Sequence, residues 1–381
     1  MRAGQYLKQA TGYKAFDPKP LPPDPPLKID VKLSRLLSQA DLALGRLDGV
    51  STLLPNPDLL VSMYVRQEAV LSSQIDGTQI TLEDLVQLAI DSKDQDFPQD
   101  IQQVVNYVSA MNYGLERLKT LPLTLRLIRE THAKLVAGVP GSDSTLGEFR
   151  TSQNWIGPVG CTLSNATFVP PPVQEMHAAL NSLERFLYDD SLPFLIQCGL
   201  VHAQFETIHP FLDANGKVGR LLITFLLYQK QALERPFLYL SRYMKLHRTE
   251  YYDRLMAIRN DGDWEGWLKF FVRGVHETSR EATKTARNIL RLREDHRRLI
   301  SENKKDKLLS ARYYLAFLEY LFEQPIVTVR MAERCLNCSF LTASKVVRRF
   351  VRWGLLHEMT GFERNRRYRY APYLALFEEA Q

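Results

Sequence analysis

Twelve residues near the middle of the chain, 209–220, bring together an imidazole, a carboxylate, an amide and two cationic side chains. They read His-Pro-Phe-Leu-Asp-Ala-Asn-Gly-Lys-Val-Gly-Arg and run directly into the apolar stretch 221–228. That stretch predicts a buried helix, whose first turn would offer free N–H groups and a partial positive charge to an anion. His209 titrates near neutrality and can act as a general base, while Asp213 can hold a divalent metal beside phosphates. These residue types at this spacing predict phosphoryl-transfer chemistry on a nucleotide.

The same segment resembles the motif of the Fic family, His-x-Phe-x-Asp/Glu-Gly-Asn-Gly/Lys-Arg-x-x-Arg. The matching residues are His209, Phe211, Asp213, Asn215, Gly216 and Arg220. Two positions depart from the motif, because Ala214 stands where glycine is usual and Lys217 stands where the first arginine is usual. Most Fic enzymes transfer AMP from ATP to a protein hydroxyl. The resemblance therefore implies a protein adenylyltransferase with ATP as substrate and Mg²⁺ as cofactor.

The resemblance also implies a role for each residue of the motif. His209 would take the proton from a Ser, Thr or Tyr hydroxyl, and Asp213 would carry the Mg²⁺ between the α- and β-phosphates. Arg220 would orient the γ-phosphate, and Lys217 would contact phosphate as a point charge. Asn215 and the loop amides would stabilise charge on the α-phosphate. The nucleotide-binding set is Phe211, which also anchors the loop, with Ala214, Asn215, Gly216, Lys217 and Arg220.

A second resemblance lies upstream, in Ser72-Ser-Gln-Ile-Asp76-Gly77. It is similar to the inhibitory motif of Fic proteins, Ser/Thr-x-x-x-Glu-Gly/Asn, with Asp76 in place of the usual glutamate. In the family that carboxylate pairs with the second motif arginine, here Arg220, and blocks seating of the γ-phosphate. Asp76 is one methylene shorter, which implies a weaker lock or a shifted backbone. A capped helix end followed by glycine is the alternative interpretation.

Between the two motifs, residues 147–172 are punctuated by glycine and proline, which with short apolar runs predicts a hairpin. By resemblance this is a flap over the active site that holds the target peptide by strand addition. An ordinary surface hairpin is the alternative. The expected tip comprises Gly160, Cys161, Thr162, Leu163, Ser164, Asn165, Ala166, Thr167 and Phe168.

From about residue 308 the pattern becomes helix, turn, helix and two short strands, which predicts a winged-helix domain. Residues 326–381 carry ten lysines and arginines against five aspartates and glutamates, within a net charge of +6. A basic segment of this kind suggests DNA or an acidic partner. A protein-interaction or dimerisation module is the alternative. Candidate DNA contacts are Lys345, Arg348, Arg349 and Arg352 on the second helix and Arg366 in the wing, beside Arg364, Arg367 and Arg369.

Helical periodicity elsewhere makes the expected fold class mainly α. The resemblance implies a Fic helical-bundle core with a β-hairpin flap, beside the α+β winged-helix domain. The expected regions are 1–95 with a proline-rich arm and the inhibitory helix, 96–275 as the catalytic core, 276–307 as a connecting helix, and 308–381 as the winged helix.

Composition sets the remaining expectations. The chain has 381 residues, 45% apolar and 24% charged, as in soluble globular proteins. It has no apolar run long enough for a bilayer and no apolar signal core at its N-terminus, so we expect a cytoplasmic protein without a membrane partner. Four cysteines exclude a disulfide scaffold. Cys335 and Cys338 have the spacing of metal ligands, but the sequence offers no second ligand pair. Two free thiols on a helix are therefore expected instead of a zinc site.

Two other functions stay open beside AMP transfer. One is removal of AMP from a modified protein, in which Asp76 would position water. The other is a DNA-binding regulator with a degenerate, nucleotide-sensing Fic core. The expected partners are a protein substrate bearing the modified hydroxyl, DNA through the C-terminal domain, and a second copy of the chain in a homodimer. Self-modification and autoinhibition are also expected.

Overall fold

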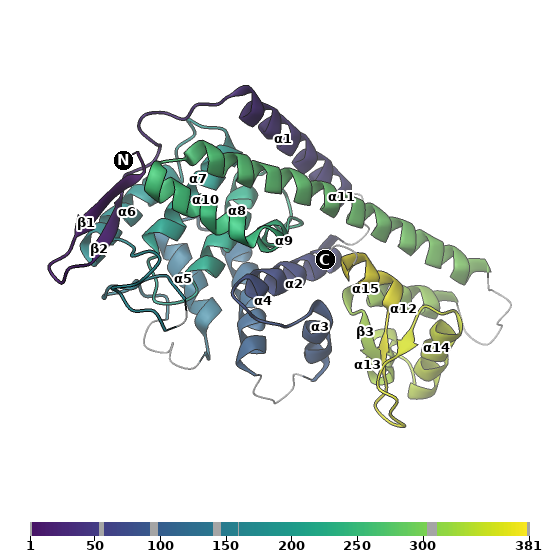
Figure 1. Ribbon diagram of the computed structural model, residues 1–381. Coiled ribbons are helices and arrows are strands. Elements are labelled where there is room, and N and C mark those ends of the chain that lie inside the picture. The colour runs from purple at the N-terminus through teal and green to yellow at the C-terminus, as the bar shows by residue number, and fades with distance from the viewer. Residues whose placement is uncertain are drawn as a thin grey trace.

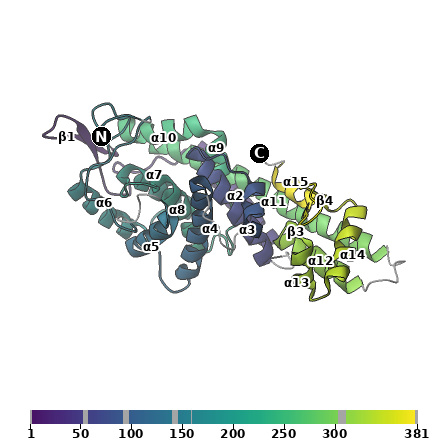
Figure 2. The same cartoon turned by 90° about the horizontal axis from the view of Figure 1, so that it is seen from below.

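Helices dominate the molecule, as the sequence predicts. The computed structural model describes residues 2–52, 57–91, 98–139, 146–158, 160–302 and 311–378. Figure 1 shows a helical core at one end, a small C-terminal unit at the other, and the long helix α11 (Trp264–Glu302) running between them. Figure 2 shows the same separation from below, with α2 (Pro57–Ile75) lying between the two parts.

A β-hairpin that the sequence pattern does not predict opens the chain. Strands β1 (Gly4–Lys8) and β2 (Lys14–Pro18) pair antiparallel. Phe16 is buried, and its N–H donates to the Val169 carbonyl at 2.9 Å. The proline-rich arm follows as irregular chain, as expected from its composition. The hairpin therefore packs on the segment that precedes α6 (Val173–Phe186).

Two buried helices form the centre of the core. α7 (Phe194–Ile208) and α8 (Asn215–Gln229) are enclosed on nearly all sides, so their sequences show no clear apolar stripe. Around them pack the helices α2, α4 (Gln99–Leu118), α5 (Leu125–Val136), α6, α10 (Arg248–Asp261) and α11. Helix α3 (Leu82–Asp91) packs against α2 and α4, and α9 (Ser241–Leu246) packs against α2, α10 and α11.

Helix α1 (Val31–Ser51) lies along α11. Asp30 caps the N-terminus of α1, since its carboxylate accepts the Leu33 N–H at 2.8 Å. α11 is continuous through residue 275, where the sequence pattern places the end of the catalytic core. That expected boundary falls inside one uninterrupted helix. The division into regions stays a prediction.

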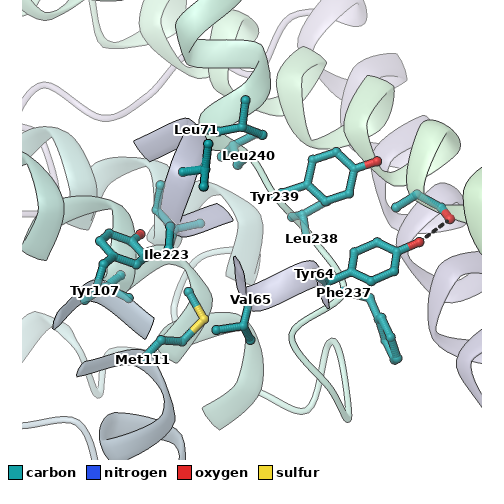
Figure 3. Packing of buried hydrophobic residues seen from close by; sticks show 14 of the residues in the cluster. Tyr64, Val65, Leu71, Tyr107, Met111, Ile223, Phe237, Leu238, Tyr239 and Leu240 are labelled. Carbon is teal, nitrogen blue, oxygen red and sulfur yellow. Dashed lines mark hydrogen bonds between the residues drawn. The ribbon is translucent and has the colours of Figure 1, made fainter. Parts of the chain in front are cut away.

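Helix α2 contacts both the core and the C-terminal unit, and Tyr64 lies where they meet. Its hydroxyl donates to the Ala282 carbonyl of α11 at 3.2 Å, and its ring packs edge-on against Phe237 with centroids 5.1 Å apart (Figure 3). The same ring contacts Phe377 of α15 (Ala371–Glu378) at 5.7 Å. A second link joins Arg369 to Glu83 of α3 at 3.3 Å.

The C-terminal unit contains the predicted helix-turn-helix and both predicted strands. Its sheet has the antiparallel order β3-β5-β4, and the sequence pattern predicts neither β3 nor α15. Its membership in the winged-helix class stays a prediction. The elements are α12 (Ala311–Glu323), β3 (Ile326–Thr328), α13 (Val329–Leu336), α14 (Phe340–Arg352), β4 (His357–Glu358), β5 (Arg367–Arg369) and α15. Throughout the part of the chain that the structure describes, no helix combines the length and apolarity needed to cross a bilayer.

Candidate active site

The site begins where α7 ends. His209 caps this helix in the left-handed conformation, with φ 49° and ψ 60°, and its N–H donates to the Phe205 carbonyl at 2.9 Å. The turn redirects the chain at once into Pro210. The Nδ1 atom of His209 is buried and has no hydrogen-bond partner among the described residues. The imidazole is therefore held by its backbone and by packing.

The loop from His209 to α8 is closed by the side chain of Asn215. Its Oδ1 accepts the Phe211 N–H and its Nδ2 donates to the Phe211 carbonyl, both at 2.8 Å. Asn215 is only 2% exposed. This differs from the predicted role on the α-phosphate, because the carboxamide is already engaged by the backbone. Asn215 shapes the loop.

Phe211 fixes the middle of the loop in the core. It is fully buried, and its ring stacks on His132 of α5 with centroids 3.8 Å apart and planes 2° apart. Nδ1 of His132 accepts the Gly147 N–H at 3.2 Å, so the ring proton lies on Nε2, 3.3 Å from the Asp213 carbonyl. Phe211 thus anchors the loop as predicted, and its buried side chain is not available to a nucleotide.

The first turn of α8 has the features of an anion site. Its first helical hydrogen bond runs from the Val218 N–H to the Ala214 carbonyl, which leaves the N–H groups of Asn215, Gly216 and Lys217 without intrahelical acceptors. Asp213 is exposed beside them, and its Oδ1 accepts the Ala214 N–H at 2.6 Å. Asp213 and the helix amides therefore lie together, as the sequence predicts.

Two side chains that the sequence pattern does not single out bind the backbone of the loop between α7 and α8. Arg150 is 2% exposed. Its Nε donates to the His209 carbonyl at 3.1 Å, and its Nη2 donates to the Pro171 carbonyl. Its backbone N–H donates to the Pro210 carbonyl. Asn154 donates to the carbonyls of His209 and Phe211 at 3.2 and 2.8 Å. A lone arginine or asparagine carries no sequence signal of such a role, because its partners are distant backbone carbonyls.

Arg220 is held by the end of helix α2. Its Nε donates to Ser72 Oγ at 2.7 Å, and its Nη2 donates to the Ser72 carbonyl at 3.1 Å and to Asp76 Oδ2 at 2.9 Å. Burial lowers the pKa of the guanidinium, but Asp76, Tyr251, Tyr107 and Glu206 together raise it above its ordinary value. The predicted pairing of Asp76 with Arg220 is therefore present, through one carboxylate oxygen. Gly77 follows with φ 107°, a conformation that favours glycine.

Comparison with known proteins agrees with this arrangement. A model of the Fic/DOC family N-terminal region matches residues 34–116, and a model of the Fic/DOC family matches residues 122–227. The region 34–227 of the chain belongs to the Fic/DOC family. It is 30% identical over 191 residues to a protein named protein adenylyltransferase Fic from Aedes aegypti, covering 49% of this chain and 34% of that one. The corresponding protein of Drosophila willistoni is 27% identical over 195 residues, which is 50% of this chain and 35% of that one.

The chain thus spans about a third of the length of these curated relatives. Among solved structures, a Fic family protein from Desulfovibrio desulfuricans superposes with a TM-score of 0.59 at 19% identity, covering 91% of this chain and 97% of that one. Fic-1 from C. elegans gives a TM-score of 0.50 at 17% identity, over 68% of this chain and 73% of that one. At these identities the structures establish a shared fold.

The two departures from the Fic motif have distinct structural consequences. Ala214 adopts φ 59° and ψ 13°, the left-handed region that a glycine would occupy without strain. Lys217 is 7% exposed, and its Nζ donates to Gln103 of α4 at 2.6 Å. Burial lowers the pKa of this ammonium, and Asp76 opposes the shift. One of the three N–H donors of Lys217 is thus engaged by Gln103.

The segment expected as the flap is a loop with a single pair of bridging residues. Ile156 and Phe168 exchange backbone hydrogen bonds of 2.8 and 3.0 Å, and the described residues between them form turns. Phe168, expected in the tip, is instead buried at the base of this loop, where the bridge forms. Asn165 Oδ1 accepts from the N–H and hydroxyl of Thr162. These local side-chain bonds take the place of a strand ladder, so the expected hairpin is wrong beyond the one bridge. Val159 lies outside the described residues.

Three histidines and two glutamates of the core have strongly shifted pKa values. His132, His202, Glu68 and Glu206 are buried, and His209 is partly buried. Burial, with the charges of Arg259 and Arg150, lowers the pKa of the His209 imidazole to about 3. Mainly through burial, the pKa values of the other two histidines fall to about 4 and those of both glutamates rise to about 7. His209 is therefore neutral at pH 7, the form that a general base requires.

Proposed function

We propose that this protein transfers AMP from ATP to a Ser, Thr or Tyr hydroxyl of a protein. The observation that carries the proposal is the loop itself, which joins a neutral imidazole to the amide-rich start of α8 and is locked by Asn215. The relatives from Aedes aegypti and Drosophila willistoni bear the name of that activity. We also propose, as the sequence predicts, that the protein forms a homodimer and acts in the cytoplasm.

The chemistry follows from the positions of these groups. The triphosphate lies over the free N–H groups of Asn215, Gly216 and Lys217, which stabilise charge on its oxygens. His209 accepts the proton of the target hydroxyl as its oxygen attacks the α-phosphorus. The bond between that phosphorus and the oxygen bridging to the β-phosphate breaks, and pyrophosphate leaves. The products are the AMP ester of the protein, pyrophosphate and one proton, first held by His209.

The donor set fits Mg²⁺. Asp213 is an exposed carboxylate with one oxygen engaged by the Ala214 N–H, and Mg²⁺ in nucleotide sites commonly takes one or two carboxylate ligands and completes its shell with phosphates and water. Asp213 would hold the ion, which when bound neutralises phosphate charge. The described residues contain no group of three or more acidic, histidine or cysteine side chains arranged for a metal.

A labelling experiment tests the proposal. The purified protein is incubated with Mg²⁺ and ATP labelled at the α-phosphate, alone and with cell lysate, and in parallel with ATP labelled at the γ-phosphate. Protein label from the α position that disappears in His209→Ala supports AMP transfer. His357→Ala is the matched control, because His357 is exposed on β4 in the C-terminal unit. Label retained in His209→Ala, or label from the γ position only, overturns the proposal.

A second function is favoured by the outer face of α14. Leu341, Lys345, Arg348 and Arg352 are all exposed and recur every three or four residues, so they form one stripe. The opposite face of the helix is buried through Ala343, Val346, Val347 and Phe350. We propose that this stripe contacts the phosphates of duplex DNA. The other candidate contacts are less available: Arg349 lies 5.8 Å from the Trp353 ring, Arg369 pairs with Glu83, and Arg366 donates to the Phe362 carbonyl in the wing.

Salt dependence tests this second function. The affinity for a labelled mixed-sequence duplex is measured by fluorescence anisotropy over a range of salt concentrations. Removal of one cation that binds a phosphate should reduce the slope of log affinity against log salt by about 0.9. Arg348→Ala and Arg352→Ala should each do so. Arg330→Ala, an exposed arginine on α13 paired with Glu333, serves as the control. Equal slopes in all variants would favour a protein-interaction role for the unit.

A further inference from the structure

Arg259 of α10 is a buried cation that touches both the end of α7 and the flap. It is 4% exposed. Its Nε donates to Thr207 Oγ1 at 3.2 Å and its Nη2 donates to the Glu206 carbonyl at 3.0 Å. The face of its guanidinium lies 3.8 Å from the centroid of the Phe168 ring. One side chain therefore connects two segments separated in sequence by nearly forty residues.

The contact with the Glu206 carbonyl replaces a helical hydrogen bond that the chain itself cannot form. In a continuing helix this carbonyl would accept the N–H of residue 210, but that residue is proline and has no N–H. A buried carbonyl without a partner is costly, and Arg259 supplies the missing donor. The same turn ends in His209, so the guanidinium stabilises the backbone from which the imidazole projects.

The contact with Phe168 fixes the base of the flap. Phe168 is 2% exposed, and its backbone forms the only pair that bridges the two sides of the described loop. A cation over a desolvated aromatic ring is favourable. Phe16 of the N-terminal hairpin also packs against this ring, with the two centroids 6.0 Å apart. Contacts with both Arg259 and Phe16 therefore restrict the movement of Phe168 at the flap base.

Arginine suits this position because it can fill all three contacts at once. Its planar fork offers donors to two acceptors while its face covers an aromatic ring, which a lysine cannot do. The hydrogen-bond partners of Arg259 in the described part of the chain are neutral: Thr207 Oγ1, the Glu206 carbonyl and Met256 Sδ. Burial lowers the pKa of the guanidinium to about 10, which leaves it charged at neutral pH.

We infer that Arg259 is a positioning residue that sets His209 and the base of the flap at a fixed relation to one another. The inference rests on the proposed AMP transfer, in which a target hydroxyl presented by the flap must meet the imidazole. Positioning of reacting groups is sensitive to small displacements, and misplacement by about 1 Å can cost on the order of a hundredfold in rate.

The experiment compares full-length Arg259→Met and Arg259→Lys with two milder variants, Thr207→Val and Phe168→Leu, each of which removes one contact. Arg254→Met is the matched control, because Arg254 lies on the same helix, is 38% exposed and pairs with Glu250. Two quantities are measured: amide hydrogen exchange, and the rate of labelling from α-labelled ATP as a function of ATP concentration.

In Arg259→Met, exchange of the Phe168 and His209 amides should rise on the order of tenfold or more, since both amides form local hydrogen bonds close to Arg259. The labelling rate at saturating ATP should fall on the order of tenfold to a hundredfold. The half-saturating ATP concentration should stay within about twofold, because Arg259 has no contact with 213–220. Lysine should restore part of the rate, and Arg254→Met should match the wild type.

The outcomes separate this inference from the proposed function. If the wild type takes no label, AMP transfer fails as a proposal, and the exchange of the Phe168 and His209 amides alone decides whether Arg259 joins the two segments. If labelling is present and Arg259→Met changes neither exchange nor rate, the inference is overturned. A rise in half-saturating ATP with uniformly faster exchange would also overturn it, since that pattern indicates general loss of structure.

Discussion

Replacing Asp76 with glycine should accelerate AMP transfer, but only modestly. Arg220 has three hydrogen bonds to the end of α2, and the two made to Ser72 survive the substitution. Only the bond to Asp76 Oδ2 is removed. The arginine that would orient the γ-phosphate is thus released from one of its three restraints, and the change leaves the catalytic loop untouched.

The size of the effect follows from the exposure of the two partners. A hydrogen bond to a charged group contributes about 1.5–3 kcal/mol when both partners are buried. The Arg220 side chain is 3% exposed, but that of Asp76 is 35% exposed, so solvent screens the pair. We discount the contribution to about 1 kcal/mol. That value corresponds to about fivefold more released arginine, and to a similar rise in labelling rate if release limits the reaction.

The assay measures the initial rate of labelling from α-labelled ATP in Asp76→Gly, Asp76→Glu and the wild type. Asp76→Glu restores the side-chain length usual in the family and can reach a second nitrogen of the guanidinium, so its rate should fall below that of the wild type. A faster Asp76→Gly and a slower Asp76→Glu cannot both result from a loss of folded protein, since that loss would lower the labelling rate in each. Equal rates in all three proteins, or a slower Asp76→Gly, would refute the inhibitory role of Asp76.

Three further predictions concern stability. Ala214→Gly should raise the unfolding free energy by up to about 1 kcal/mol, because the left-handed conformation costs alanine more than glycine; a lower value in denaturant unfolding would contradict this. Asn215→Ala should lower it by about 2–3 kcal/mol, since both hydrogen bonds to Phe211 are removed, and a change below about 0.5 kcal/mol would count against the lock. Below about pH 6.5 the three histidines with lowered pKa values are protonated more readily in the unfolded chain, which destabilises the fold as pH falls. The two buried glutamates bind protons more readily in the folded chain and oppose the effect. Urea unfolding between pH 6.5 and 4.5 should therefore show a net loss of about 1.4 kcal/mol per pH unit, and a flat or rising profile would refute the assignment of these burial effects.

The sequence predicts the catalytic loop well because its essential features are local. His209, Asp213 and the first turn of α8 lie within a few residues of one another, and their types alone restrict the chemistry. The pairing of Asp76 with Arg220 is nonlocal, and it is predictable only because a second motif marks the other end. Arg150, Asn154 and Arg259 are not predictable in this way, since each binds backbone carbonyls, which any residue type provides.

The errors in the expected fold have a similar origin. The flap has the glycine and proline content of a hairpin, but the Thr162 and Asn165 side chains close local turns instead. The N-terminal strands are only five residues each and carry no clear alternation, so they escape a search for periodic apolar residues. Their place in the fold depends on Phe16 and Val169, a contact that no short window of sequence contains.

Helix α2 joins two parts of the molecule that the sequence presents as separate. In its middle Tyr64 packs on Phe377 of the C-terminal unit, and at its end Ser72 and Asp76 hold Arg220. If Arg220 orients the γ-phosphate of ATP as proposed, a ligand of the C-terminal unit that displaces this helix changes the affinity for ATP. By thermodynamic reciprocity, ATP then changes the affinity for that ligand by the same factor. The contacts of this one helix limit the strength of the coupling. Because the coupling is reciprocal, it can be measured as a change in the affinity for either ligand.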